Sequence, residues 1–182
     1  MPELFKNKYR IESCRLKGWD YAQAGYYFIT ICTKNRIDYF GKIENGKIHL
    51  SHVGEIVKEE WIKTAMIRKN VILDEFIIMP NHIHGIIFIN NYERTNEPIK
   101  FGKIVAVETS RRDVTTAKLL QPNSIGSIIC QFKSICTKKI NKQYGQNYFF
   151  WQDRYYDHVI REEQSLYKIR EYIFNNPIKW KE

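Results

Sequence analysis

The sequence predicts an α+β fold of the ferredoxin-like (RRM-like) kind, with an antiparallel sheet, two helices packed on it and an extra C-terminal helix. Two observations carry this prediction. Short runs rich in β-branched and aromatic residues alternate with amphipathic stretches in the order strand, helix, strand, strand, helix, strand. A chain of 182 residues, 43% of them hydrophobic, can also bury one sizeable core. We therefore expect one domain whose open sheet face is a surface suited to nucleic acid.

The first third of the chain predicts a strand, a hairpin and a helix. Residues 25–33 are rich in β-branched and aromatic side chains and predict the first core strand. An Asn-Gly pair between alternating segments in residues 40–50 is typical of a two-stranded hairpin. Ser51 can cap a helix that runs to about Arg68. The apolar face of that helix comprises Val53, Ile56, Val57, Trp61 and Ile62.

Two strands and a second helix are predicted next. Residues 71–79 form one apolar run, and a second begins at His82 after only Pro80-Asn81, which indicates neighbouring antiparallel strands. A helix is expected from Ser124 to about Lys142. Its apolar side comprises Ile125, Ile128, Ile129, Phe132, Ile135, Cys136 and Ile140.

The chain ends with a last strand and a final helix. Residues 157–161 predict the strand, and the helix runs from Glu162 to about Asn175, where Pro177 stops it. Residues 1–24 form a basic N-terminal arm, which leaves 25–182 as the domain. Within it, residues 90–122 lose periodicity and predict a variable, mobile insertion.

Charge and composition narrow the functional classes. Lys and Arg exceed Asp and Glu by 29 − 20 = 9, which favours polyanionic partners such as nucleic acid. No stretch approaches the roughly 20 apolar residues of a membrane span, and the N-terminus lacks the apolar core of a signal peptide, so we expect a cytoplasmic protein that contacts no membrane. The four cysteines show no C-x-x-C spacing and predict reduced thiols.

Basic and aromatic residues in the second half are candidate DNA contacts. A half-apolar, half-basic helix could lie along a phosphate backbone, and exposed aromatic side chains could stack on unpaired bases. Solvated lysines and packed aromatics are the simpler alternative. The candidates are Lys133, Lys138, Lys139, Arg154, Tyr155 and Arg161.

Two histidines stand one residue apart at the start of a buried strand. Side chains alternate across a strand, so His82 and His84 project from one face while Ile83 points to the other. Their imidazoles can therefore share one metal ion. The alternative is a pair of ordinary histidines at a sheet edge.

The final helix carries a tyrosine beside its apolar stripe of Leu166, Ile169 and Ile173. Tyr172 and Asn176 are four residues apart and share one helix face. If this face packs across the histidine strand, one residue is a nucleophile and the other a third metal ligand. Pro177 disturbs the helix at Asn176, so Asn175 is the alternative ligand; Tyr155, Tyr156 and Tyr167 are alternative nucleophiles, Tyr156 first among them.

Three segments together resemble a known family. Residues 79–85 (MPNHIHG), 151–161 (WQDRYYDHVIR) and 171–177 (EYIFNNP) are similar to transposases of the IS-200 kind, and most to the branch called REP-associated tyrosine transposases. The resemblance runs from residue 25 to residue 180, with residues 90–122 the least assignable. The histidine pair corresponds to the family's HUH motif, in which U is a bulky apolar residue, here Ile83.

This resemblance implies a single-tyrosine DNA endonuclease and strand transferase of a mobile element. Such an enzyme cuts and rejoins single-stranded DNA next to a hairpin, here a REP-like hairpin or an insertion-sequence end, through a 5′-phosphotyrosine. Tyr172 would be the nucleophile, and His82 and His84 would hold Mg²⁺ or Mn²⁺. Asn176 stands where relatives often have a glutamine as third ligand. Relatives often form dimers, so a homodimer is one expectation.

Two other functions fit the same residues. One is a noncatalytic nucleic-acid-binding module on a ferredoxin-like sheet, which binds without covalent chemistry. The other is a metal-dependent hydrolase with a water nucleophile, which leaves no protein adduct.

Overall fold

The computed structural model describes residues 16, 18–90 and 121–180, and the statements below concern these residues. The elements, in chain order, are β1 (Gly25–Cys32), η1 (Lys34–Arg36), β2 (Gly41–Glu44), β3 (Lys47–Leu50), α1 (His52–Ile67), β4 (Val71–Met79), β5 (His82–Ile89), α2 (Ile125–Tyr144), β6 (Tyr156–Ile160), α3 (Glu163–Phe174) and η2 (Pro177–Lys179), where η marks a short 3₁₀ turn.

Four strands form one antiparallel sheet in the order β4-β5-β1-β6. With α1 between β1 and β4, and α2 between β5 and β6, this is the β-α-β-β-α-β arrangement of ferredoxin-like folds. The predicted fold class is confirmed. The hairpin β2–β3 is a separate two-stranded sheet inserted between β1 and α1.

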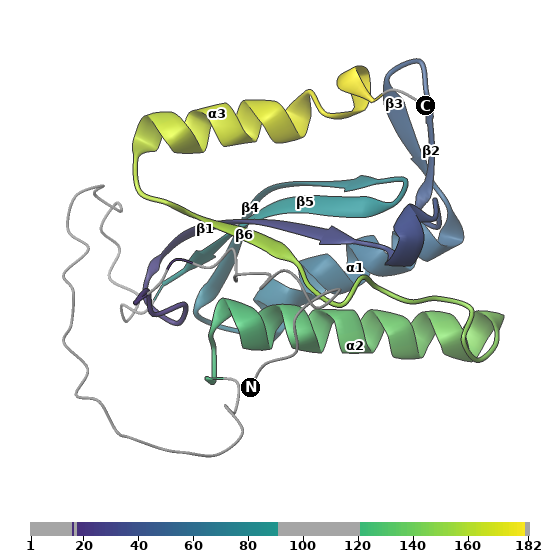
Figure 1. Cartoon of the computed structure of the whole chain (residues 1–182), viewed down its shortest axis with the longest axis horizontal. Helices are drawn as coiled ribbons and strands as arrows, with labels where there is room; N and C mark the ends of the chain where they lie inside the picture. The colour runs from purple at the N-terminus through teal and green to yellow at the C-terminus, as the bar shows by residue number, and fades with distance from the viewer. Residues whose placement is uncertain (1–15, 17, 91–120, 181–182) are drawn as a thin grey trace, which may run out of the picture.

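The sheet is covered on both faces (Figure 1). Helices α1 and α2 lie together on one face, and α3 lies on the other, where it packs against β4 and β6. The expectation of an open sheet face was therefore wrong over this region. The last helix is amphipathic, and it buries its apolar stripe against the sheet face that the two core helices leave uncovered.

Side-chain alternation divides the sheet between a large and a small core. Tyr27, Ile29 and Ile31 of β1 point to α1 and α2, whereas Phe28 points to α3. The small core under α3 consists of Phe28, Ile86, Ile160, Leu166 and Ile173. Because β5 is an inner strand with both faces covered, all of its residues are buried. Its even-numbered residues, the two histidines included, belong to the α3 side.

Local signals in the sequence account for the element boundaries. Ser51 and Ser124 cap α1 and α2 by accepting hydrogen bonds from the N–H groups of Gly54 (3.1 Å) and Ser127 (3.2 Å). Asn45 and Gly46 adopt positive φ angles of 52° and 71° in the hairpin turn. Helix α2 continues two residues beyond the predicted Lys142, to Tyr144.

The predicted apolar faces of α1 and α2 need correction at one position each. Ile62 is 44% exposed. It directly follows Trp61, and one step along a helix rotates it away from the packed face formed by Val53, Val57, Trp61 and Thr64. On α2, Ile135 is only half-buried, and it lines a small depression between α1 and α2 together with Thr64 and Ile67.

The arm and the insertion lie mostly outside the described residues, since positions 1–15, 17 and 91–120 are not described. In the described part of the arm, Trp19 and Tyr21 pack against the large core, and Trp19 Nε1 donates to the Tyr27 hydroxyl (3.3 Å). Tight packing thus begins before the predicted boundary at residue 25. Among the described helices, none is long and apolar enough to cross a membrane. Cys32, Cys130 and Cys136 are free thiols.

Candidate functional site

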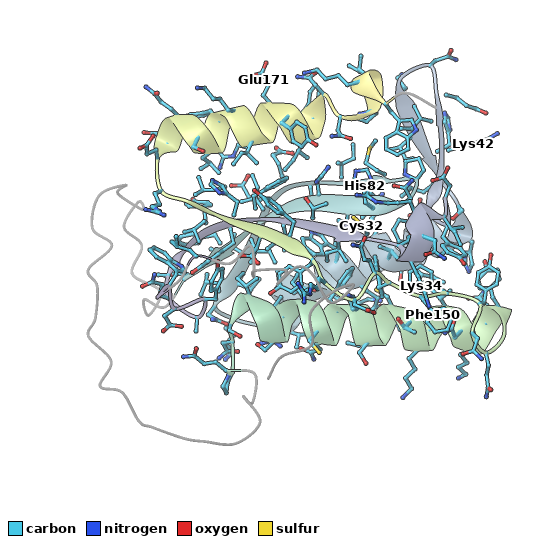
Figure 2. All side chains as sticks on the ribbon, viewed as in Figure 1. Cys32, Lys34, Lys42, His82, Phe150 and Glu171 are labelled. Carbon is cyan, nitrogen blue, oxygen red and sulfur yellow. The ribbon has the colours of Figure 1, made fainter. Side chains whose placement is uncertain are left out.

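The histidine pair begins β5 directly after the turn that joins it to β4. Met79 and His82 pair across this hairpin, so Pro80 and Asn81 form its entire loop. His82 and His84 are 5% and 6% exposed and lie on the α3 side of the sheet. Figure 2 shows His82 between the sheet and α3. The predicted position at a strand start is correct, and both imidazoles are buried.

The two imidazoles face each other through the same kind of nitrogen. His82 Nε2 and His84 Nε2 are 3.1 Å apart, with the rings inclined at 73°. Two nitrogen lone pairs at this separation repel each other unless a hydrogen or a cation lies between them. The arrangement therefore suits either a shared proton or a shared metal ion.

Hydrogen bonds hold the outer nitrogen of each ring. Asn81 Oδ1 lies 2.9 Å from His82 Nδ1, and Thr30 Oγ1 lies 2.8 Å from His84 Nδ1. Partners of this kind orient metal-binding histidines and set which ring nitrogen carries the hydrogen. Phe28 stacks on the His84 ring at 5.4 Å between centroids. Both rings are thus fixed in orientation.

Both histidines are neutral at pH 7. Burial, followed by the positive charge of Arg36, lowers the pKa of His82 from 6.5 to about 4. Burial, followed by His82 and Arg36, lowers the pKa of His84 to about 3. Neutral imidazole is the form that donates a lone pair to a metal. The pair is therefore available as a ligand across the physiological range.

Tyr172 completes the cluster from the opposite layer. Its hydroxyl lies 3.2 Å from His84 Nε2, and its ring packs edge-on against Phe28 at 6.2 Å. The side chain is nevertheless 43% exposed, so a substrate can reach it. Figure 2 shows the preceding residue, Glu171, on the outer side of α3. The helix thus turns Tyr172 toward the histidines.

A partly buried ion pair and the small core hold α3 in this position. Leu166 and Ile173 are 2% and 1% exposed. Arg170 Nε donates to Asp74 Oδ1 of β4 (2.8 Å), and a second hydrogen bond joins the other nitrogen and oxygen of the pair. Sequence reasoning missed this pair, because Asp74 and Arg170 are 96 residues apart and neither belongs to a motif.

The alternative tyrosines are placed differently. Tyr156 lies on the same sheet face with its ring 6.3 Å from Phe28, and it is 48% exposed. The Tyr167 hydroxyl is 3.5 Å from Glu163 on the helix surface. Tyr155 is partly buried against the large core. The geometry therefore favours Tyr172 as the tyrosine that works with the histidines.

The predicted third ligand, Asn176, follows the end of α3 and precedes the short turn η2. Asn175 (φ −85°, ψ 0°) is the C-cap of α3, and Asn176 (φ −59°, ψ −43°) has helical backbone angles. Among the described residues, no hydrogen bond joins its side chain to either histidine, and no three His, Cys, Asp or Glu side chains gather as a metal site. Instead, the Trp180 ring lies 5.6 Å from that of His82. The third ligand stays a prediction.

The candidate DNA contacts lie away from the histidines. Helix α2, with Lys133, Lys138 and Lys139, is on the far side of the sheet (Figure 1). Lys139 forms an ion pair with Glu60 (2.5 Å), and Lys133 donates to the Gln152 carbonyl (2.5 Å). An open depression on this side is lined by Lys133, Ser134, Thr137, Lys138, Trp151 and Asp153.

The remaining candidates have separate surroundings. Arg154 is exposed, and the Arg161 guanidinium lies 5.7 Å from the centroid of the Trp19 ring. The neighbouring Trp151 is 7% exposed and packs against Phe132 and Phe149, which fits the alternative of a packed aromatic. None of these side chains contributes to the histidine cluster.

Known proteins share this fold. No family model matches the chain. A solved structure of a REP-associated tyrosine transposase bound to a REP hairpin has a TM-score of 0.59 and 17% identity, over 91% of this chain and 73% of that one, which shows a common fold. A structure of a proposed transposase from Deinococcus radiodurans R1 has a lower TM-score of 0.48 and 14% identity, over 88% of this chain and 97% of that one.

A much closer sequence relative comes from Haemophilus influenzae. This uncharacterized protein is 39% identical to the chain over 172 residues, which cover 93% of the chain and 89% of the relative. Identity at this level over nearly full length indicates common descent and one shared fold. The chain belongs to the same protein family as this Haemophilus influenzae protein.

Proposed function

We propose that the protein cuts and rejoins single-stranded DNA as a tyrosine transposase of the HUH, REP-associated kind. One observation carries the proposal: the Tyr172 hydroxyl lies 3.2 Å from Nε2 of His84, which itself lies 3.1 Å from Nε2 of His82. A nucleophile and a pair of metal-ligating nitrogens thus meet at one point. The shared fold with a transposase bound to a REP hairpin supports DNA as the substrate.

The reaction is an exchange of phosphate esters. The Tyr172 oxygen attacks the phosphorus of the scissile phosphodiester and loses its proton, and the bond from phosphorus to the 3′-oxygen breaks. The 3′-oxygen leaves with a proton, and the downstream strand stays on the protein as a 5′-phosphotyrosine. A second 3′-hydroxyl reverses the step and joins a new strand. No external energy source is needed, because the number of phosphate ester bonds does not change.

The histidine pair fits a divalent cation. The donors are two neutral imidazoles whose Nε2 atoms converge and whose Nδ1 atoms are held by Asn81 and Thr30. His82 and His84 would hold Mg²⁺ or Mn²⁺, with Asn176 as the proposed third ligand. A bound cation offsets the negative charge that develops on the phosphate oxygens. The protein's own part is to keep both rings neutral, oriented and next to the tyrosine.

Both halves of the site come from one chain in this structure. Tyr172 of α3 contacts His84 of β5 through the fold's own packing. A single copy can therefore assemble the proposed centre, and homodimer formation is a separate proposal. The basic surface of α2, on the other side of the sheet, is available to hold DNA outside the cleavage site.

A covalent adduct is the test. The protein is incubated with Mn²⁺ and a pool of single-stranded DNA hairpins with randomised flanks, labelled at either the 3′ or the 5′ end, and then denatured. The 3′ label should remain on the polypeptide and the 5′ label should not, because the tyrosine keeps the downstream strand. Tyr172→Phe should abolish the adduct, whereas Tyr156→Phe and Tyr167→Phe should retain it.

Other outcomes separate the rival functions. If the DNA is cut without forming an adduct, and Tyr172→Phe still cuts it, the protein is a hydrolase with a water nucleophile. A mobility shift without cutting, for every hairpin in the pool, means a noncatalytic binding module. Either result overturns the proposed function.

A further inference from the structure

Asn81, the residue before the histidine pair, has every hydrogen-bonding group of its amide engaged. Its Nδ2 group donates to the Asp38 carboxylate (2.7 Å) and to the Arg36 carbonyl (3.2 Å). Its Oδ1 lies 2.9 Å from His82 Nδ1. The residue is 8% exposed, so water does not readily replace these partners. The amide is therefore held in a single orientation.

This orientation dictates where His82 carries its hydrogen. Asp38 and the Arg36 carbonyl only accept hydrogen bonds, so the nitrogen of the Asn81 amide must face them and the oxygen must face His82. An amide oxygen also only accepts, so His82 Nδ1 must be the donor. In a neutral ring this leaves Nε2 with its lone pair, directed at His84.

His84 has a partner of a different kind. The Thr30 hydroxyl can either donate to His84 Nδ1 or accept from it, so it does not select one tautomer. Because His82 Nε2 is an acceptor, the metal-free ring of His84 supplies the hydrogen between the two Nε2 atoms. His84 can free its Nε2 lone pair by losing that proton to water and gaining one from water at Nδ1, where the Thr30 oxygen then accepts the hydrogen bond. The two rings thus differ: the tautomer of His82 is fixed, whereas that of His84 can change.

The loop that holds Asn81 is itself built for this contact. Asn35 and Arg36 both have positive φ angles, 57° and 56°, which non-glycine residues rarely adopt. Thr33 is fully buried, and its backbone N–H donates to the Asn81 carbonyl (2.9 Å), which ties the loop to the β4–β5 turn. The single hydrogen of its hydroxyl is shared between the carbonyls of Ile37 and Asn81 (2.9 and 3.1 Å). The left-handed turn aims the Arg36 carbonyl at the Asn81 amide.

We infer that Asn81, oriented by Asp38 and the Arg36 carbonyl, is a positioning residue that fixes His82 as a lone-pair donor for a divalent cation. This inference deepens the proposed function and rests on it for the identity of the site. It assigns a role to a loop more than 40 residues away in sequence, since Asp38 and Asn81 are 43 residues apart.

The test combines a spectroscopic signature with metal affinity. Full-length protein with ¹⁵N-labelled histidine is studied without metal by long-range ¹H–¹⁵N correlation, which reports the tautomer of each ring. Wild type should show the Nδ1–H form at His82, and Asn81→Leu should shift it toward the Nε2–H form. The Mn²⁺ affinity, measured by electron paramagnetic resonance, should fall about tenfold in Asn81→Leu.

Variants of the exposed Asp38 give the same test without a change in the core. Asp38→Ala should weaken Mn²⁺ binding by about threefold, and Asp38→Asn, which keeps an accepting oxygen, should restore it. Glu75→Ala, which removes an exposed carboxylate from β4, is the matched control and should bind Mn²⁺ like wild type.

The inference and the proposed function fail separately. If Asn81→Leu and Asp38→Ala keep the Nδ1–H tautomer and the wild-type Mn²⁺ affinity, the positioning role is overturned, whatever the DNA assay shows. If the tautomer and affinity change as expected but no hairpin yields an adduct, the positioning role stands and the proposed strand cutting fails.

Discussion

The Asp74–Arg170 ion pair should hold the tyrosine helix on the sheet, and this can be measured. The Asp74 side chain is 14% exposed and that of Arg170 is 33% exposed. Burial alone would raise the pKa of Asp74, but hydrogen bonds from Arg170 and from the Glu75 N–H outweigh it and lower that pKa. Replacing Arg170 by methionine keeps most of the side-chain volume and leaves the carboxylate without its cation.

The loss of unfolding free energy expected from breaking this ion pair lies between the values for exposed and for buried pairs. Breaking a surface pair costs about 0–1 kcal/mol, and removing one partner of a fully buried pair costs about 3–5 kcal/mol. Since Arg170 is one-third exposed, we expect Arg170→Met to lower the free energy of unfolding by about 2 kcal/mol. Asp74→Asn should cost a similar amount, and the double variant should cost less than the sum of the two.

Urea unfolding of the wild type and the three variants gives the coupling energy, and amide hydrogen exchange in α3 reports where it acts. Because the pKa of Asp74 is lower in the folded than in the unfolded state, its contribution is present above the unfolded value of about 4. It is lost as the pH falls through the folded pKa. The difference between wild type and Arg170→Met should therefore shrink in acid. A coupling energy below about 0.5 kcal/mol at pH 7 would refute the reasoning.

Substitutions at three further positions test the packing and one helix cap. Gly85→Ala should destabilise the fold by about 1–3 kcal/mol, seen as a lower melting temperature, because an added Cβ would lie 2.5 Å from Cζ2 of the buried Trp61 ring; an unchanged melting temperature would contradict this packing. Ser51→Ala should cost about 1 kcal/mol in urea unfolding, through loss of the cap to Gly54, and Ser51→Asn should recover most of it; equal losses in both variants would argue against the cap. Ile173→Ala should cost about 2–4 kcal/mol and speed amide exchange in α3 more than in α2, since the side chain is 1% exposed in the small core; uniform exchange would contradict a separate α3 contact.

The sequence predicts elements well where the signal is local. Ser51 and Ser124 mark helix starts, Asn45-Gly46 marks a hairpin, and the two residues between Met79 and His82 allow only a tight connection. Each of these features depends on the backbone geometry of a few consecutive residues, so the local sequence is enough to predict it. The alternation that places His82 and His84 on one face is of the same kind.

Features that depend on contacts between residues far apart in the sequence were harder to predict. The partners of the histidines, Thr30 and Asn81, depend on strand register and on side-chain orientation at a turn. Burial of both sheet faces depends on α3 folding back across β4 and β6, and only the amphipathic stripe hinted at it. The lysines of α2 were predicted DNA contacts because of their charge, and α2 lies on the opposite face of the sheet from α3. Charge is visible in a sequence, but the face that carries it is not.

The most direct measurement of the central idea, that Tyr172 and the histidine pair form one strand-cutting centre, is mass spectrometry of the adduct. After nuclease trimming, trypsin separates the candidate tyrosines into the peptides 155–161, 162–168 and 171–179. Peptide 171–179 has Tyr172 as its sole tyrosine. We predict that the nucleotide mass is found on this peptide and is absent from His84→Ala protein. Nucleotide on either of the other two peptides, or an undiminished adduct in His84→Ala, would contradict the assignment.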